Sequence, residues 1–422
     1  MRRSLLFSLL FFLIWSAVLG FLPRNAQAQN TIAIRNARIV TVSGPVIEKG
    51  TVLIESDQIV AVGEVEMPEE AQVFEAAGLT IYPGLFDAQT TLGLSEIGAV
   101  QMSNDFQELG EFTPQLRAFE AIHADSEQIP VARANGITHV VSLPNGGTIP
   151  GQAVLFHLDG VTPEQMVDRK QAALVLDFPT LLPASTDEPF RETRQRYAER
   201  IQEIKSLFER ARHYERAKKT GSRIIVREYE ALIPYLNEGA LVIIQVNRAM
   251  DIKNAVTFAQ EEELNYVLMG AVDAWKVADF LSQHKSRVIL GPLQRLPIRE
   301  DDPVDIIYRT PSILAQHGVP FAITTDSVAD VRNLPYEAGN AVAYGLSWEA
   351  ALHSITLAPA RFFGVDDRLG SIDVGKLANL VLVRRDLLDF SGEIIQVFIR
   401  GKSVDLENRH TRLYKRYLRD QP

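Results

Sequence analysis

The polar residues of this sequence that could act together follow short apolar runs at distant places in the chain. Asp326 follows one such run in "VPFAITTDS", and Gln89 and Thr91 stand two residues apart in "YPGLFDAQTTLGL". A third run, in "VIIQVNRAMDI", supplies three more polar residues, namely Gln245, Asn247 and Arg248. A partly buried carboxylate can move protons, while amide, hydroxyl and guanidinium groups can hold a polar ligand. We take Asp326 as the candidate catalytic acid/base and the other five residues as candidate substrate contacts.

Asp326 is expected to have a partner, because an ionised carboxylate that is withdrawn from water is costly unless it is paired. The sequence offers Asn247, Arg248 and the lysine of "DAWK", Lys276, as partners. Two interpretations of Asp326 remain open from the residues alone. It is either a carboxylate held structurally by a cation or a general base that works without a metal.

The elements that must position these residues lie in the middle of the chain, where short apolar runs alternate with helical stretches. Eight runs can be counted, at 81–86, 137–143, 153–157, 173–178, 241–246, 266–269, 288–290 and 321–324. Such a pattern is typical of parallel strands that are buried on both faces. We therefore predict an α/β fold, a (β/α)8 barrel over residues 82–365, with its site at the carboxyl ends of the strands. A charged segment over 185–219 is predicted to be an outer helix, capped by Ser185 and Glu188.

Both ends of the chain show a different pattern, in which apolar and polar residues alternate with a period of two. The pattern covers 31–81 and returns only in "GSIDVGKLANLVLVRRD" and "EIIQVFIRGKSVDLE". Neither end has enough strands for a stable domain of its own. We therefore predict one small composite β-sandwich built from residues 29–81 and 366–422.

The first 28 residues have the features of a bacterial signal peptide. Arg2 and Arg3 precede an apolar run over 5–21, and Ala26-Gln27-Ala28 has the small-x-small form of a cleavage site. This predicts secretion across the inner membrane to the periplasm or cell exterior, with no membrane attachment after cleavage. The alternative of an uncleaved anchor stays open. The 422-residue chain has no cysteine, which excludes disulfides and thiolate metal sites, and its net charge of -10 argues against nucleic acid as a partner.

A family resemblance is visible in motifs that are spread over essentially all of the sequence after residue 28. They are "IRNARIVT", "YPGLFDA", "GITHVVSLPNGGTIPGQ", "VIIQVNRAMDI", "VPFAITTDS" and "APARFFGVDDRLGSIDVGKLANLVLV". In these motifs the chain resembles the amidohydrolase superfamily, in particular its imidazolonepropionase-like members. The resemblance implies a barrel with a composite β-sandwich, zinc or another divalent metal, and hydrolysis of non-peptide C–N bonds in small, cyclic amide-like molecules.

The chain departs from the family at the metal ligands that the resemblance implies. Gln89 and Thr91 stand at the His-x-His positions, Gln245 stands at the strand-five histidine, and the strand-six histidine falls at Met269 or Gly270. Asp326 is retained. Neutral amide and hydroxyl oxygens are poor ligands for zinc, so we predict no metal and no other cofactor. The aspartate of the family's C-terminal motif is also replaced, by Asn379.

The histidines do not offer a replacement metal site in their spacing. They are His123, His139, His157, His213, His284, His317, His353 and His410, and none lies two or four residues from another. His139 and His157 fall within predicted strands, where a histidine is more often a satisfied core residue than a ligand. They meet in space only if those strands are neighbours.

Two functions from different classes follow from these observations. The first is a hydrolase of small cyclic amide-like substrates with an altered or metal-free site that uses Asp326. The second is a catalytically inactive barrel that binds a small molecule or pairs, as a homo- or hetero-oligomer, with an active relative.

Overall fold

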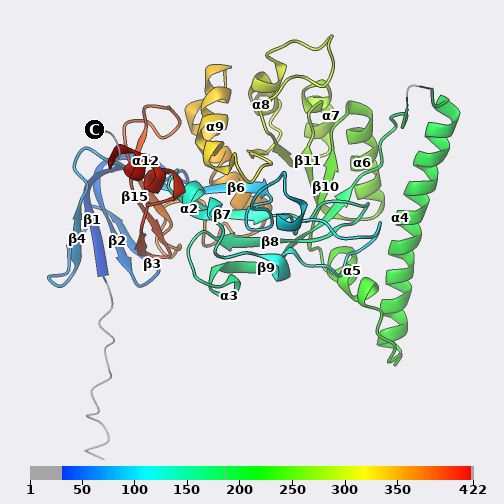
Figure 1. Cartoon of the computed structure of the whole chain (residues 1–422), viewed down its shortest axis with the longest axis horizontal. Coiled ribbons are helices and arrows are strands. Elements are labelled where there is room, and N and C mark those ends of the chain that lie inside the picture. Colours follow the sequence, from blue (N-terminus) through cyan, green and yellow to red (C-terminus); the bar gives the residue numbers. More distant parts are fainter. Residues whose placement is uncertain (1–30, 186, 420–422) are drawn as a thin grey trace, which may run out of the picture.

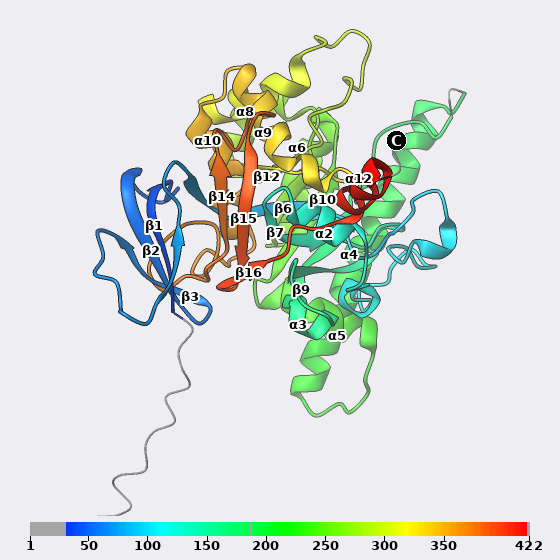
Figure 2. The ribbon, with the colours of Figure 1, turned by 60° about the vertical axis from the view of Figure 1, so that its left-hand side comes forward.

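The computed structural model describes residues 31–185 and 187–419, so the predicted signal peptide lies outside the described residues. Two sheets organise the described chain, and Figures 1 and 2 both show a small sheet domain at one side of a larger barrel. The N-terminal strands and the C-terminal strands share the small domain. The middle of the chain forms the barrel and its helices.

The small domain contains one mixed sheet to which both ends of the chain contribute. Its strands run in the order β16-β15-β14-β5-β1-β2-β3, and β4 pairs with β1. Their bounds are β1 Thr31–Ile39, β2 Ile47–Glu55, β3 Gln58–Gly63, β4 Gln72–Glu75, β5 Thr80–Pro83, β14 Leu380–Arg384, β15 Glu393–Ile399 and β16 Lys402–Val404. The antiparallel pairing of β5 with β14 joins the two ends. Both chain ends therefore share one sheet, and the sequence prediction of a sandwich corresponds to this single mixed sheet.

The barrel sheet contains eight strands of the described chain, in the order in which they follow along the sequence. They are β6 Leu85–Thr90, β7 Ile137–Ser142, β8 Gly151–His157, β9 Val167–Asp177, β10 Leu241–Val246, β11 Asn265–Gly270, β12 Val288–Leu290 and β13 Phe321–Ile323. The predicted run at 81–86 is divided at Gly84 between the small sheet and the barrel. A Cβ atom at Gly84 would lie 2.1 Å from Thr138 Oγ1, so only glycine fits this junction.

One barrel strand differs in direction from a regular (β/α)8 barrel. β8 is antiparallel to both of its neighbours, β7 and β9, whereas the other neighbouring pairs in the sheet are parallel. The physical reason is the short connection over 143–150, which contains no helix to carry the chain back across the sheet. A short connection can join only antiparallel neighbours.

Helices cover the outside of the barrel. Their bounds are α2 Gln128–Arg133, α3 Pro163–Met166, α4 Phe190–Lys219, α5 Arg227–Asn237, α6 Ala249–Glu261, α7 Ala278–Gln283, α8 Ile306–Gln316, α9 Leu334–Ala343, α10 Trp348–Ser354, α11 Leu357–Phe362 and α12 Arg409–Arg419. Short 3-10 turns lie at Gln101–Ser103, Ala118–Ala121, Ala274–Val277 and Val331–Asn333. Within the described chain, every helix is too short or too polar to cross a membrane.

The long helix α4 confirms the predicted outer helix but begins later than expected (Figure 1). Pro189 precedes its first turn, and Glu188 accepts a hydrogen bond from the backbone N–H of Ala184 instead of closing a capping box. The extended backbone that proline favours in the residue before it explains the later start. The apolar face that the sequence indicated is buried at Ile204 and Phe208.

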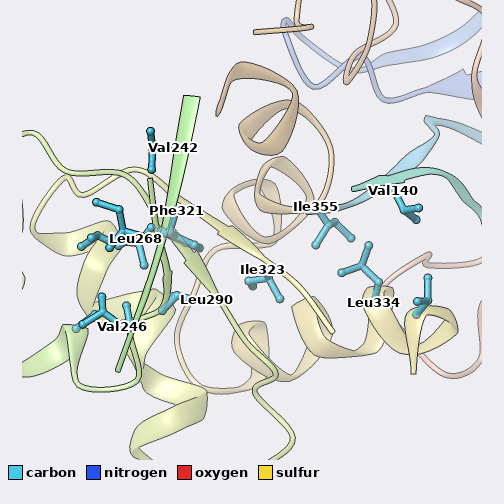
Figure 3. Packing of buried hydrophobic residues seen from close by; sticks show 14 of the residues in the cluster. Val140, Val242, Val246, Leu268, Leu290, Phe321, Ile323, Leu334 and Ile355 are labelled. Atoms are coloured by element: carbon cyan, nitrogen blue, oxygen red, sulfur yellow. The ribbon is translucent and has the colours of Figure 1, made fainter. Parts of the chain in front are cut away.

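Two apolar layers hold the barrel together because successive strand residues point to opposite faces. Val242, Leu268 and Ile323 belong to the layer between the strands and helices, and Figure 3 shows Ile323 between Leu290 on one side and Leu334 of α9 on the other. The alternate residues of the same strands, among them Ile243, form a second cluster inside the barrel. This inner cluster fills the barrel below the predicted site.

Candidate functional site

The barrel closes at a seam between β6 and β13, and Asp87 lies fully buried in that seam. Its carboxylate accepts hydrogen bonds from the hydroxyls of Thr324 and Thr325, the latter at 2.5 Å. The Thr324 hydroxyl also lies 2.8 Å from the carbonyl oxygen of Gln89. The backbone N–H of Asp326 donates to that same carbonyl at 3.2 Å. These bonds hold the end of β6 beside the segment that carries Asp326.

Gln89 and Asp326 are in direct contact across the seam. The side-chain N–H of Gln89 at Nε2 donates to Oδ1 of Asp326. The side chain of Gln89 is buried, and its other atom, Oε1, has no hydrogen-bond partner among the described residues. Of the predicted site residues, these two are the pair that the structure brings together through their side chains.

Asp326 lies at the barrel mouth, where solvent reaches it although protein atoms surround most of it. Desolvation raises the pKa of its carboxyl group to about 6, and the charge of Arg295 and the Gln89 hydrogen bond act in the opposite direction. Solvent at the exposed side of the carboxylate screens its interaction with Arg295. A carboxyl group of this kind changes its charge close to neutral pH.

The predicted partners of Asp326 are wrong. Lys276 instead forms ion pairs with Asp273 at 3.0 Å and with Asp302 at 2.8 Å. Arg248 stands at the start of α6, where its carbonyl oxygen accepts the Ile252 N–H at 2.8 Å.

The cation that acts on Asp326 is Arg295, in the loop after β12. The sequence analysis missed it because no apolar run leads directly into that position. No simple signal in the sequence could have paired these two residues.

Gln245 lies in a row of residues that crosses the barrel sheet. Strand register places it beside Asp177 of β9 on one side and Met269 of β11 on the other. Met269 in turn neighbours Ile289. Met269 and Ile289 are buried in the cluster inside the barrel. The row therefore offers the amide of Gln245 and the carboxylate of Asp177. Met269 places an apolar side chain at the position where the family resemblance implies the strand-six histidine.

Asn247, Thr91 and Gly270 belong to turns that follow the strands. A Cβ atom at Gly270 would lie 2.5 Å from Oδ1 of Asn247, so the exposed asparagine packs closely against the end of β11. The backbone carbonyl of Thr91 accepts the Leu94 N–H at 2.9 Å. Within the described residues, the side chain of Asp326 is hydrogen-bonded to Gln89 and not to Asn247 or Thr91. Both of these stay predictions as substrate contacts.

The residues at the implied metal positions do not fit a zinc site. These positions hold the amides of Gln89 and Gln245 and the hydroxyl of Thr91. The strand-six position holds either the thioether of Met269 or, at Gly270, no side chain, and Asp326 is the one carboxylate. Within residues 31–185 and 187–419, no three His, Cys, Asp or Glu side chains gather in an arrangement that could hold a metal ion. Moreover, the Gln89 N–H donates to Oδ1 of Asp326 and so places an N–H donor against this carboxylate. Zinc is held by imidazole, carboxylate or thiolate groups, and an amide N–H repels it.

Two further carboxyl groups near the strand ends were missed in the sequence analysis. Burial and the nearby charge of Glu111 raise the pKa of Asp177 to about 6. Burial raises the pKa of Glu337 to about 7, although the backbone N–H groups of Leu293 and Gln294 donate to it at 2.8 and 3.1 Å. Asp177 ends the run "AALVLD" and could have been found by the rule that located Asp326. Glu337 lies within α9, where no such rule applies.

A cavity of about 200 Å³ opens beside Asp177. Thr148, Arg196, Tyr197 and Arg200 contribute to its lining. Arg200 also pairs with Glu111 at 3.3 Å, and the Thr148 hydroxyl donates to Glu111 at 3.0 Å. The carboxylate of Asp177 and the guanidinium groups of Arg196 and Arg200 therefore face one cavity at the carboxyl end of β9.

His139 and His157 do meet, because β7 and β8 pair with these two residues opposite each other. Asn379 Nδ2 lies 3.2 Å from Nδ1 of His157 and 3.5 Å from Nδ1 of His139. Burial lowers the pKa of both histidines, which keeps them neutral. His157 also faces Asp168 at 3.5 Å. The pair is a hydrogen-bonded part of the core between the barrel and the small sheet, as the sequence favoured.

Comparison with known proteins finds similarity to amidohydrolases in sequence and in fold. Residues 262–404 match the amidohydrolase family. The amidohydrolase tasK of Hapsidospora irregularis is 24% identical over 87% of this chain, which spans 41% of the length of that relative.

Two solved structures show the same fold. An amidohydrolase from Thermotoga maritima MSB8 aligns with a TM-score of 0.77 and 24% identity over 89% of this chain and 99% of that one. Molinate hydrolase aligns with a TM-score of 0.55 and 16% identity over 90% of this chain and 95% of that one. Together with the match of residues 262–404 to the amidohydrolase family, these likenesses show that the chain shares its barrel and composite sheet with amidohydrolases.

Proposed function

We propose that this protein binds a small amide-like or urea-like molecule at the barrel mouth and does not use a metal-activated water. The observation that carries the proposal is the contact between Gln89 Nε2 and Asp326 Oδ1. It satisfies the carboxylate with an amide where relatives of the superfamily would need a cation. Loss of ligands alone would leave Asp326 unpartnered, whereas here a specific side chain supports it.

The chemistry of the mouth favours a ligand with N–H donors. Asp326 and Asp177 both present carboxylate oxygens to solvent, and Gln245 beside Asp177 adds an amide. Carboxylates accept hydrogen bonds strongly and cannot donate when ionised. Amides, ureas and cyclic amides offer N–H groups of this kind. The names of two structural relatives, molinate hydrolase and phenylurea hydrolase B, fit this class of small molecule.

A second candidate function is hydrolysis without a metal, with Asp326 as the general base. The raised pKa of Asp326 favours it, because a base with a pKa near the working pH transfers protons efficiently. In this reaction Asp326 removes a proton from water, the oxygen attacks the substrate carbonyl carbon, and the proton passes to the departing nitrogen. The imidazolonepropionase-like subtype, the export of the protein and pairing with an active relative remain proposals as well.

The experiment combines ligand binding and turnover on metal-free protein. A panel of cyclic amides, ureas and dipeptide-like amides is screened by calorimetry and by product analysis after treatment with a chelator. Saturable binding without turnover supports the first function, and turnover that disappears in Asp326→Asn supports the second. Asp301→Asn is the control, because Asp301 is exposed and pairs only with Arg299 at 3.4 Å. Turnover that requires added metal would contradict both.

A further inference from the structure

A second cavity lies at the opposite end of the barrel from Asp326. It has a volume of about 420 Å³ and opens between the amino ends of β12 and β13 and the helices α10 and α11. Arg287 stands just before β12, and Val319 and Pro320 stand just before β13. Its size falls within the range of small-molecule sites.

Three basic side chains line this cavity, namely Arg287, His353 and Arg361. Among the described residues, no carboxylate lies within ion-pair distance of either arginine. The hydrogen bonds of Arg287 both come from Nη2, to Asn265 Oδ1 and to the Tyr266 carbonyl, each at 2.6 Å. Its Nε and Nη1 hydrogens are left for another acceptor, because a guanidinium carries five N–H donors.

Arg361 and His353 meet at the rim of the same cavity. Nη1 of Arg361 lies 3.4 Å from Nε2 of His353, and the guanidinium must be the donor because it has no acceptor. Burial and the charge of Arg361 lower the pKa of His353, so this histidine is neutral. Arg361 is exposed, which makes the cavity accessible from solvent.

The rest of the lining is apolar. Val319, Phe321 and Phe362 form part of it, and the guanidinium of Arg287 lies 5.9 Å from the centre of the Phe362 ring. The guanidinium of Arg287 is half-buried, and desolvation lowers its pKa although the neighbouring Tyr266 acts in the opposite direction. Most buried cations in proteins are paired, so an unpaired arginine beside an apolar wall indicates a missing anion.

We propose that this cavity is a binding site for a small organic carboxylate with an aromatic or branched apolar body. Arg287 and Arg361 bind the carboxylate group, and the wall of Val319, Phe321 and Phe362 covers the body. The planar fork of arginine matches a carboxylate better than it matches any neutral group. The site is separate from the mouth, so it regulates or accompanies the proposed function and does not depend on it.

The test is calorimetric titration of the full protein with benzoate, with benzamide as its uncharged counterpart and phenyl phosphate as an alternative anion. Benzoate is expected to bind saturably and benzamide at least tenfold more weakly. Arg361→Gln is expected to weaken benzoate binding about tenfold, since a hydrogen bond to a charged group is lost. Asp326→Asn is expected to leave benzoate binding unchanged, because the mouth lies at the other end of the barrel.

Two controls keep the result clear. Arg191→Gln removes an exposed arginine from α4, far along the chain from the cavity, and must leave binding unchanged. Arg287→Lys keeps the charge but loses the fork, and should weaken binding in a protein that still unfolds cooperatively. Equal binding of benzoate and benzamide, binding of phenyl phosphate alone, or full affinity in Arg361→Gln would overturn the proposal.

Discussion

Gln89 is the side chain that gives the carboxylate of Asp326 a hydrogen-bond partner. A buried amide supplies an N–H donor without a net charge, so it can stabilise Asp326 where a cation would otherwise bind. The replacement has a cost, because Gln89 Oε1 is buried without a partner. The contact therefore has the character of a specific pairing between two residues that are 237 positions apart.

Removal of the Gln89 amide should be costly as long as Asp326 can ionise. We expect Gln89→Leu to lower the free energy of unfolding at neutral pH by about 1–3 kcal/mol, the range for leaving a polar partner unsatisfied. Urea denaturation measures this change in the free energy of unfolding. Gln195→Leu is the control, because Gln195 is exposed on α4 and contacts only Glu199 at 2.9 Å. If the loss is just as large in an Asp326→Asn background, the two side chains are not coupled.

At the scale of elements, the seam between β6 and β13 depends on side chains more than on a regular ladder. These strands are the two ends of the barrel sheet order, and Asp87 joins them through Thr324 and Thr325. We expect Asp87→Ala to leave the Thr325 hydroxyl without its acceptor, while the Thr324 hydroxyl keeps the carbonyl oxygen of Gln89. The free energy of unfolding should fall by about 1–3 kcal/mol.

Urea denaturation gives the size of that loss, and hydrogen exchange locates it. Faster exchange should concentrate in β6 and in the segment after β13. Asp389→Ala is a suitable comparison, because Asp389 is exposed and bonds locally to Ser391. A stability equal to that of the unchanged protein would show that the seam closes by packing alone.

The elements also show what the sequence could and could not predict. The period-two pattern at both chain ends and the apolar runs in the middle located the strands, since burial acts on nearby residues of the chain. The reversed direction of β8 could not be read from its composition, because strand direction depends on the connection that precedes it. The start of α4 was misplaced at Ser185, because Pro189 acts more strongly than a capping pattern.

The candidate site was predictable in part for the same reason. Gln89, Gln245 and Asp326 could be placed at strand ends because the carboxyl ends of barrel strands converge. Their roles in a site stay predictions. Arg295 and Glu337 were missed because they reach the site from a loop and a helix. Lys276 was one of three candidate partners of Asp326, and its ion pairs with Asp273 and Asp302 depend on the packed structure.

At the scale of the whole molecule, buried acids should give stability an unusual dependence on pH. The pKa of Glu337 is raised from 4.5 to about 7, so the folded protein binds this proton more tightly than the unfolded chain. The stabilisation that the protonated carboxyl group of Glu337 gives the folded protein is therefore fully present below pH 4.5. It is lost as the pH rises towards 7.

Glu337→Gln isolates this effect, because glutamine does not titrate. We expect the stability of the unchanged protein, relative to Glu337→Gln, to fall between pH 4.5 and 7 by at most about 1.4 kcal/mol per pH unit. Urea denaturation at several pH values measures the difference. A constant difference over this range would mean that Glu337 is ionised in the folded protein.

The most direct test of the account is the metal content of the purified protein after expression with added zinc and exhaustive dialysis. Elemental analysis should find far less than one metal ion per chain, and Asp326→Asn should not change that value. The contact of Gln89 with Asp326 should at the same time keep thermal stability independent of chelator. One tightly bound metal per chain that is lost in Asp326→Asn would contradict the central claim that an amide has replaced the metal.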